Sequence, residues 1–285
     1  MNFLNLIFIF LFFLGLSVGS FINALVFRLK TGRKIIRARS ICPKCKKKLE
    51  TWDLIPLLSF IILHGRCRAC RQKISWQYPL VELATGIIFI LVFYYQIEKV
   101  GSWSWINIFS LFFYLFITFS LITIFVYDLK YLLIPGQIIW PALIFNLAYL
   151  LLAFFFYFSK NKEIYYRLYP HLWPSVHPPL YFLYGILLGT GIFLALVLLS
   201  KEKLMGAGDI QIGLLMGLLL GFPLTLLALS LSFILGAFIG ILLVIFKKKS
   251  LKSQVPFAPF LITTIFITLF WGDWIINWYL KLLRF

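Results

Sequence analysis

The sequence predicts an all-α polytopic membrane protein with about eight transmembrane helices and a small cytosolic loop that carries four cysteines. Of its 285 residues, 62% are hydrophobic and only 13% are charged, whereas a soluble domain has roughly 25% charged residues. The chain is divided into apolar runs close to the roughly 20 residues that a helix needs to cross a bilayer. All four cysteines lie in the one sizeable polar stretch.

The formal net charge of +18 could indicate a nucleic-acid partner, but the basic residues occur in short blocks between apolar runs. If the N-terminus lies outside, the cytosolic segments hold 21 Lys and Arg and the outer segments hold 6. This asymmetry follows the positive-inside rule. We therefore expect no nucleic-acid binding, contact with anionic lipid at the cytosolic face, and a multi-pass protein whose N-terminus is outside.

The first predicted transmembrane helix occupies residues 1–27. No basic residue precedes its apolar run and a dense basic block follows it, which is typical of a retained anchor and not of a cleaved signal peptide. Residues 80–285 are predicted to form a seven-helix membrane core. Its helices are expected at about 80–97, 105–127, 137–158, 180–199, 209–220 and 224–246, with a last one that begins near Pro256.

One helix and one loop of this core depart from the pattern of full crossings. The helix at 209–220 is too short for a full crossing, so it either spans part of the membrane or thins it. The loop at 159–179 contains His171 and His177, which we interpret as part of a linker and not as metal ligands. Pairs of glycines spaced four residues apart are expected at helix–helix contacts; they are Gly185/Gly189, Gly213/Gly217 and Gly236/Gly240.

Residues 28–79 are predicted to form a cytosolic loop domain and hold 14 of the 27 Lys and Arg. Its 52 residues contain Cys42, Cys45, Cys67 and Cys70, as two C-x2-C pairs separated by 21 residues. This spacing is typical of structural zinc held by four thiolates, and bound metal supplies folding energy that a small core lacks. The rival interpretation is redox chemistry, because nearby positive charge favours thiolates. The apolar segment 54–63 is expected to pack on these pairs or to lie along the membrane surface.

Asp128 and Asp209 are the carboxylates that indicate chemistry. Both are expected at the cytosolic face, Asp128 at the end of one helix and Asp209 at the start of another. Two aspartates in one wet membrane pocket share a proton, so one can take a proton from water while the other polarises a peptide carbonyl. The alternative is two independent helix-end residues, with Asp209 as an N-cap. Gly206 and Gly208 would let another backbone approach Asp209, and Glu82 is a possible helper.

The combined motifs resemble those of the bacterial prepilin leader peptidases, membrane aspartic proteases of the Gly-x-Gly-Asp class. The resemblance extends over about residues 19–260. It is carried by Gly19-Ser20-Phe21-Ile22-Asn23 with Arg28, both cysteine pairs, Tyr78-Pro79-Leu80-Val81-Glu82, Asp128 with Ile134-Pro135, Gly206–Asp209, and Pro256-Phe257-Ala258-Pro259-Phe260.

This resemblance implies that Asp128 and Asp209 are catalytic, and we place Gly206, Gly208 and Glu82 as substrate-binding or supporting residues. It also implies a location in the bacterial inner membrane. The implied substrates are prepilins or pseudopilins of type IV pili and type II secretion, whose short basic leader is removed at the cytosolic face after a Gly. Many such proteins then methylate the new N-terminus with S-adenosylmethionine, although no glycine-rich cofactor loop is evident here.

Three residues depart from the family pattern. Gly136 replaces an Asp or Asn, Gln211 replaces a Lys, and Ala258 replaces a Gly. None of the three is expected to touch the aspartate pair. The loss of the Lys removes a charge close to Asp209, so the usual pH behaviour of the family is not carried over.

Two other functions compete with proteolysis. A proton-coupled transporter would use the two aspartates as proton carriers and the glycines as a broken-helix site, but no internal repeat is visible. A non-enzymatic zinc-knuckle scaffold would depend on its cysteines and tolerate loss of Asp209. Asp273 is expected at the opposite membrane face, away from either kind of site.

Overall fold

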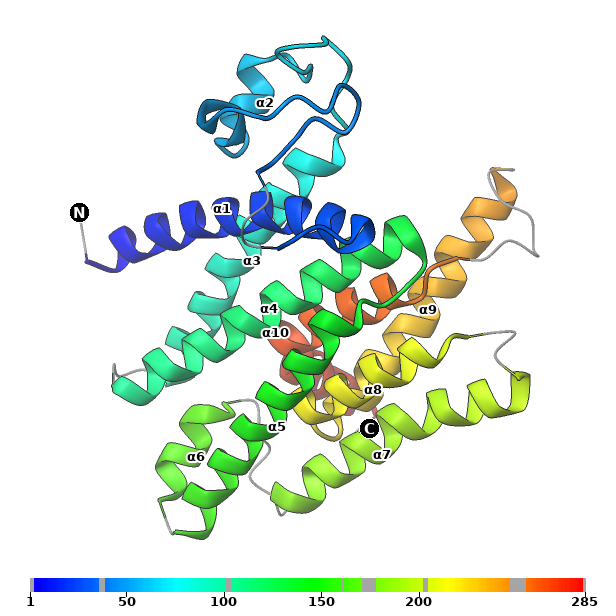
Figure 1. Ribbon diagram of the computed structural model, residues 1–285. Helices are drawn as coiled ribbons and strands as arrows, with labels where there is room; N and C mark the ends of the chain where they lie inside the picture. Colours follow the sequence, from blue (N-terminus) through cyan, green and yellow to red (C-terminus); the bar gives the residue numbers. More distant parts are fainter. Residues whose placement is uncertain are drawn as a thin grey trace.

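The computed structural model describes residues 3–35, 39–100, 104–159, 161–170, 178–201, 205–246 and 255–283, with only the backbone described at 3 and 98–100. Within these residues, seven helices are long and apolar enough to cross a membrane. They are α1 (Phe3–Thr31), α3 (Gln77–Val100), α4 (Trp105–Tyr131), α5 (Gly136–Phe158), α7 (Pro178–Ser200), α9 (Leu224–Ile245) and α10 (Ala258–Leu283). The shorter apolar helix α8 (Ala207–Leu220) completes the predicted set of eight (Figure 1).

The predicted fold class is therefore confirmed, and the helix ends differ from expectation by a few residues. The helix α4 continues to Tyr131, so Asp128 lies within its last turn and not at its end. The helix stops because Leu132 adopts a left-handed conformation with φ of 54°, and its N–H donates to the carbonyl of Asp128 at 2.9 Å.

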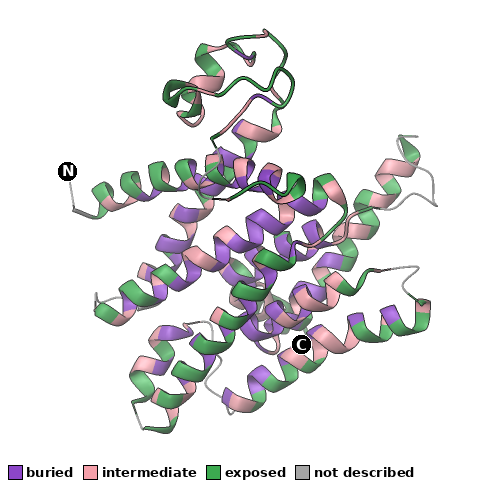
Figure 2. Ribbon diagram, viewed as in Figure 1, coloured by how far each residue is buried: buried purple, intermediate pink, exposed green. Residues whose placement is uncertain are grey.

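Side chains along the helix contacts are buried, and the outward faces are exposed (Figure 2). Many exposed side chains are large and apolar, including Phe10, Leu151 and Ile234. In water such a surface would be unfavourable, whereas lipid tails match it. Together with the seven long apolar helices, this surface makes the chain a multi-pass membrane protein.

Glycines set the closest helix contacts. Where α7 contacts α8, a Cβ added to Gly217 would lie 2.6 Å from the carbonyl oxygen of Gly185. The two backbones are thus too close for a larger residue, which confirms the predicted helix contact of these glycines. The prediction for Gly236/Gly240 is confirmed only at Gly236, where an added Cβ would lie 3.5 Å from the ring of Phe260 in α10; at Gly240 it would meet nothing within 4 Å among the described residues. Such a motif only permits close approach, and here no second backbone comes near.

A glycine pair that we did not predict joins α1 to α3. A Cβ on Gly15 would lie 2.7 Å from the Cα of Gly86, and one on Gly19 would lie 2.6 Å from the Cα of Glu82. Only hydrogen fits at either position, because each contact is with backbone. This crossing holds the N-terminal helix against the helix that follows the cysteine domain.

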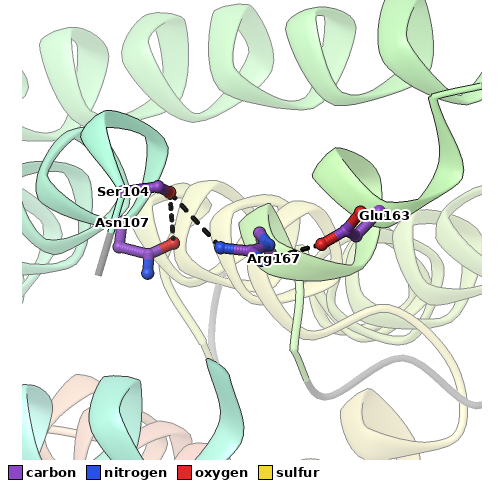
Figure 3. Close-up of polar contacts among 4 residues, drawn as sticks. All are labelled: Ser104, Asn107, Glu163 and Arg167. Carbon is purple, nitrogen blue, oxygen red and sulfur yellow. Dashed lines mark hydrogen bonds and ion pairs between the residues drawn. The ribbon is translucent and has the colours of Figure 1, made fainter. Parts of the chain in front are cut away.

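The expected linker at 159–179 contains a short helix, α6 (Lys162–Leu168). Its Arg167 pairs with Glu163 at 2.7 Å and donates to the hydroxyl of Ser104 at 3.4 Å, just before α4 (Figure 3). The hydroxyl of Ser104 in turn donates to the side-chain oxygen of Asn107 at 3.2 Å. The linker prediction was therefore wrong for α6, while His171 and His177 lie outside the described residues.

Candidate active site

The aspartate site is built where several helix ends meet. The C-terminal ends of α1 and α4 and the N-terminal ends of α3, α5, α8 and α10 lie toward the same side of the bundle (Figure 1). Asp128 comes from the end of α4 and Asp209 from the start of α8. Residues far apart in the chain are thus presented at one end of the bundle.

Asp128 is buried, with 6% of its surface exposed. Two groups act directly on its carboxylate: the like charge of Asp209, and the backbone N–H of Ala258 at the start of α10, which donates a hydrogen bond to it. Three helices that are separate in sequence therefore meet at this carboxylate. The two aspartates are not independent, because each carboxylate lies within the electrostatic reach of the other.

Asp209 is half-buried at the third position of α8, and Gly206 is the N-cap of that helix. The N-cap interpretation of Asp209 was therefore wrong. Its carboxylate instead accepts a hydrogen bond from the N–H of Gly206, as the acidic residue of a capping box does. The positive end of the helix dipole also stabilises a carboxylate in this first turn.

Gly208 allows α8 to approach the connection between α4 and α5. A Cβ at this position would lie 2.6 Å from the Cδ1 of Ile134. Gly206 has ordinary extended angles, φ −83° and ψ 156°, and an added Cβ would meet nothing closer than 4.0 Å. The expected close approach thus occurs at Gly208, against a side chain and not a backbone, and does not occur at Gly206.

Ala258 overturns one expectation. None of the three departures from the family pattern was expected to touch the aspartate pair, yet the N–H of Ala258 donates to Asp128. The side chain of Ala258 is almost fully buried. The sequence did not reveal this contact, because a backbone donor leaves no side-chain signature.

Glu82 contacts the cysteine domain and α1. Its Oε2 accepts the N–H of Leu57 at 2.8 Å, and its carboxylate also accepts from the hydroxyl of Ser20. Leu57 itself has a left-handed φ of 59°. Glu82 is buried and therefore fixes the chain between the two cysteine pairs to the membrane helices.

That inter-pair chain forms a short helix, α2 (Leu58–Ile62), after a single 3-10 turn, η1 (Thr51–Leu54). On one side the ring centroid of Phe60 lies 5.0 Å from that of Trp76, whose side chain is itself exposed. The other side leaves Ile61 and Ile62 exposed. The contact of Phe60 with Trp76 lies within the cysteine domain, and both packing on the cysteine pairs and lying along the membrane surface stay predictions.

The four cysteine sulfurs form one cluster, within 4.8 Å of one another. The Sγ atoms of Cys42 and Cys70 are 4.0 Å apart. Tetrahedral coordination with Zn–S bonds of about 2.3 Å places sulfurs about 3.8 Å apart. The cluster therefore fits a metal ion of this kind, held by Cys42, Cys45, Cys67 and Cys70.

The two cysteine pairs have the same backbone conformation. The residue after each pair, Lys46 or Arg71, adopts a left-handed φ of 59° or 56°. In each pair that residue's N–H donates to the carbonyl of the first cysteine at 2.9 Å. Because the two turns have the same conformation, each presents its two sulfurs to the common cluster.

Backbone donors within the turns act on the sulfurs. The N–H of Cys70 is the main cause that lowers the pKa of the Cys67 thiol to about 7. The N–H of Gln72 lowers the pKa of Cys70, but burial and the three neighbouring sulfurs outweigh it and raise that pKa to about 11. The thiol of Cys67 therefore ionises readily, whereas the neighbouring sulfurs disfavour ionisation of Cys70. A bound cation would stabilise all four sulfurs as thiolates, because its positive charge offsets their mutual repulsion.

Asn23 is a site residue whose role the sequence did not reveal. It lies on α1 with 5% of its surface exposed. Its Nδ2 donates to the carbonyls of Gly19 and Tyr78 at 3.3 and 3.2 Å, whereas its buried Oδ1 has no hydrogen-bond partner among the residues that the structure describes. Its place within the first family motif was the only available signal.

Comparison with known proteins agrees with this architecture. Residues 13–96 match the bacterial peptidase A24 N-terminal domain, and residues 114–241 match the type IV leader peptidase family. The first match covers most of α1, the cysteine domain and most of α3, and the second runs from α4 into α9. Both aspartates fall within the second match.

Individual relatives match over nearly their whole length. The chain is 31% identical to a prepilin leader peptidase/N-methyltransferase of Bacillus subtilis, over 95% of this chain and 97% of that protein. Like-named proteins of Aeromonas hydrophila and Legionella pneumophila are each 29% identical, over 94% and 93% of this chain and 92% of each relative. No solved structure matches. The chain therefore belongs to the type IV leader peptidase family of membrane enzymes.

Proposed function

We propose that this protein is an aspartic endopeptidase that removes the short basic leader of prepilins or pseudopilins at the cytosolic face of the bacterial inner membrane. We further propose that it then methylates the new N-terminus. The observation that carries the proposal is the meeting of Asp128 and Asp209 at one end of the bundle, close enough for their charges to interact. Family membership supplies the substrate class.

In the proposed reaction the two carboxylates hold one proton between them. The ionised aspartate takes a proton from water as the water oxygen attacks the peptide carbonyl carbon, and the protonated aspartate gives its proton to the carbonyl oxygen. The proton taken from water then passes to the leaving nitrogen as the C–N bond breaks, and one hydroxyl of the tetrahedral intermediate returns its proton to the other aspartate, which restores the shared proton. The products are the leader carboxyl group and the free amine of the mature pilin.

Backbone groups orient the two acids for this task. The N–H of Ala258 holds the carboxylate of Asp128, and the N–H of Gly206 holds that of Asp209. Backbone donors fixed by helix starts need no reorganisation during the reaction, which is the basis of preorganised electrostatic catalysis. Gly208 contributes by letting the start of α8 approach Ile134.

Two further groups belong to the proposal. Zinc bound by Cys42, Cys45, Cys67 and Cys70 would supply folding energy to a domain that is small for a core of its own. S-adenosylmethionine, when bound, supplies the methyl group that the freed amine accepts. The charge asymmetry of the sequence supports an outside N-terminus, a cytosolic site and contact with anionic lipid.

The test uses the full chain in lipid nanodiscs with a synthetic prepilin-like substrate, whose mass is followed with and without S-adenosylmethionine. We expect loss of the leader in both conditions and gain of one methyl group only when S-adenosylmethionine is present. Asp128→Asn and Asp209→Asn should each abolish leader loss, while Asp273→Asn should leave it intact. Proton-coupled uptake with unchanged substrate mass would instead indicate the transporter.

A further inference from the structure

Phe193 lies on α7, a helix that carries none of the acids or donors of the candidate active site, and its side chain is fully buried. Its ring contacts α8, since a Cβ added to Gly213 would lie 2.7 Å from the Cδ2 of Phe193. Gly213 follows Asp209 by about one helical turn. Phe193 therefore rests against the helix that carries Asp209, close to that carboxylate along the chain.

The backbones of α7 and α8 are in contact beside this ring. A Cβ added to Gly213 would also lie 2.9 Å from the carbonyl carbon of Gly189, and Gly189 precedes Phe193 by about one turn of α7. The two helices cannot approach each other further, because backbone already meets backbone. The ring of Phe193 is thus held in a fixed place relative to α8.

The ring of Phe193 also faces the start of α10. Its centroid lies 6.1 Å from that of Phe257, just before α10. Phe233 of α9 completes the cluster, 6.4 Å from Phe193 and 5.3 Å from Phe257, and such separations are typical of interacting aromatic rings. Because Phe233 is exposed whereas Phe193 has no exposed surface, Phe193 is the inner member of this cluster.

Phe257 is joined directly to the group that holds Asp128. The N–H of Ala258, which donates to Asp128, belongs to the planar peptide group whose carbonyl is that of Phe257. This carbonyl accepts the N–H groups of Phe260 and Leu261 at 3.0 and 3.3 Å, where α10 begins. A displacement of Phe257 would therefore turn the peptide group and move its N–H away from Asp128.

We propose that Phe193 is a positioning residue that sets the separation of Asp128 and Asp209, an inference that rests on the proposed peptidase function. On one side it contacts α8, which carries Asp209, and on another it contacts Phe257, whose peptide group holds Asp128. Catalytic groups must be held to within about 0.5 Å by neighbours that packing locks in place. A fully buried ring between the supports of the two acids meets this requirement.

Ordinary core packing is the competing interpretation of Phe193. A side chain that only fills space stabilises the fold, so its truncation lowers Tm and leaves the kcat of the folded enzyme unchanged. A positioning residue also changes the reaction, because a catalytic group misplaced by about 1 Å can cost roughly 100-fold in rate. KM should change little in either case, since a side chain without exposed surface cannot touch the substrate.

Phe193→Leu in the full-length protein in nanodiscs tests this role, with Phe182→Leu as the matched control. Phe182 is on the same helix and also almost fully buried, but it packs on Phe154 and Tyr169 near the other end of α7. We expect both variants to lose Tm, and only Phe193→Leu to lower kcat for leader cleavage, by about tenfold, with KM unchanged. Equal kcat values in the two variants, or a loss confined to KM, would overturn the proposal.

The route through α10 is tested by combining Phe193→Leu with Ala258→Pro, which removes the N–H that Asp128 accepts. Since residues that act through one contact are non-additive, Phe193→Leu should lower kcat little further in the proline background. Losses that multiply would contradict this route. Phe233→Ala opens the same cluster from its exposed side, where folding depends on it less, and is the second variant. It should also lower kcat, and a folded Phe233→Ala with normal kcat would count against the cluster.

Cross-linking gives a measure of the separation that does not depend on cleavage. In Asp128→Cys/Asp209→Cys a short bismaleimide should join the two positions, and mass spectrometry quantifies the joined peptides. Adding Phe193→Leu should lower the yield, whereas adding Phe182→Leu should not. A lowered yield in a protein whose wild type does not cleave would refute the peptidase and keep the spacing role. Normal wild-type cleavage with an unchanged yield would refute the spacing role alone.

Discussion

Gly206 and Gly208 stand on either side of Ala207, yet the structure gives them different tasks. Gly206 contributes only its backbone N–H to Asp209 and has open space at its Cα. Gly208 has no room for a methyl group, because Ile134 fills that space. Position in a motif alone therefore does not reveal which glycine is sterically required.

We predict that Gly208→Ala reduces leader cleavage by about tenfold or more, because overpacking of 1–3 kcal/mol must be relieved by shifting the start of α8 and with it Asp209. Gly206→Ala is the matched control and should keep most activity. Initial rates of leader loss measure both variants. The double variant Gly208→Ala/Ile134→Ala should recover part of the rate; equal rates for the two single variants would refute the steric role.

At Ala258 the important group is the backbone donor. Ala258→Pro removes the N–H that holds Asp128 while keeping the first helical position of α10, where proline is tolerated. We predict that it lowers kcat about tenfold or more, because one charge-assisted hydrogen bond is lost, and that Ala258→Gly stays active. Helical content by circular dichroism checks folding; a folded proline variant with normal kcat would contradict this role.

Much of the residue-scale site could be predicted from sequence, and the reason is physical. Carboxylates within apolar segments are rare and costly, so Asp128 and Asp209 were conspicuous. The donors that orient them were not predictable, because the N–H of Ala258 is like that of any other residue. The free oxygen of Asn23 was equally hidden, because only the folded contact of α1 with α3 buries it.

At the scale of elements, the long helices were predictable because their apolar runs are long and clearly bounded. The helix α6 was not, because a few ring and hydrogen-bond contacts stabilise it and not a long apolar run. Glycine pairs were predicted with mixed success: Gly185/Gly189 form a close backbone contact, Gly236 meets only side chains and Gly240 meets nothing within 4 Å among the described residues, and Gly15/Gly19 were overlooked. Spacing shows that two helices can approach, but only the fold shows whether a partner is there.

The contact of α1 with α3 gives a prediction whose sign depends on tertiary packing. Alanine is intrinsically favoured over glycine in a helix by about 1 kcal/mol, so Gly191→Ala, with nothing within 4 Å of the new Cβ, should be neutral or stabilising. Gly19→Ala should instead lower the apparent Tm by several degrees, because its Cβ would collide with the backbone of α3. Thermal unfolding followed by tryptophan fluorescence compares them; a stabilised Gly19→Ala would disprove the tight crossing.

The cysteine domain makes a separate prediction. Purified protein should contain one zinc ion per chain by elemental analysis, and Cys42→Ser/Cys67→Ser should contain none, because half of the sulfur ligands are lost. Leader cleavage should persist in this variant, since Asp128 is held by α8 and α10 and not by the cysteine domain. Ser59→Ala, in the same domain, controls for nonspecific loss. Full zinc content in the double variant would exclude this metal site.

The whole molecule keeps the proposed peptidase site apart from the cysteine domain. The aspartates lie where α4, α8 and α10 meet, whereas the cysteine domain contacts α3, where Glu82 accepts the N–H of Leu57. Peptide cleavage and metal binding are therefore expected to be separable by mutation.

The central claim, that Asp128 and Asp209 act as one unit, is tested most directly by a double-mutant cycle on leader cleavage. Asp128→Asn, Asp209→Asn and the double variant are compared with wild type by long-incubation mass spectrometry. Because residues that act as a unit are strongly non-additive, the double variant should retain the same residual rate as either single variant. Losses that multiply, with each single variant retaining substantial cleavage, would show two independent residues and contradict the account.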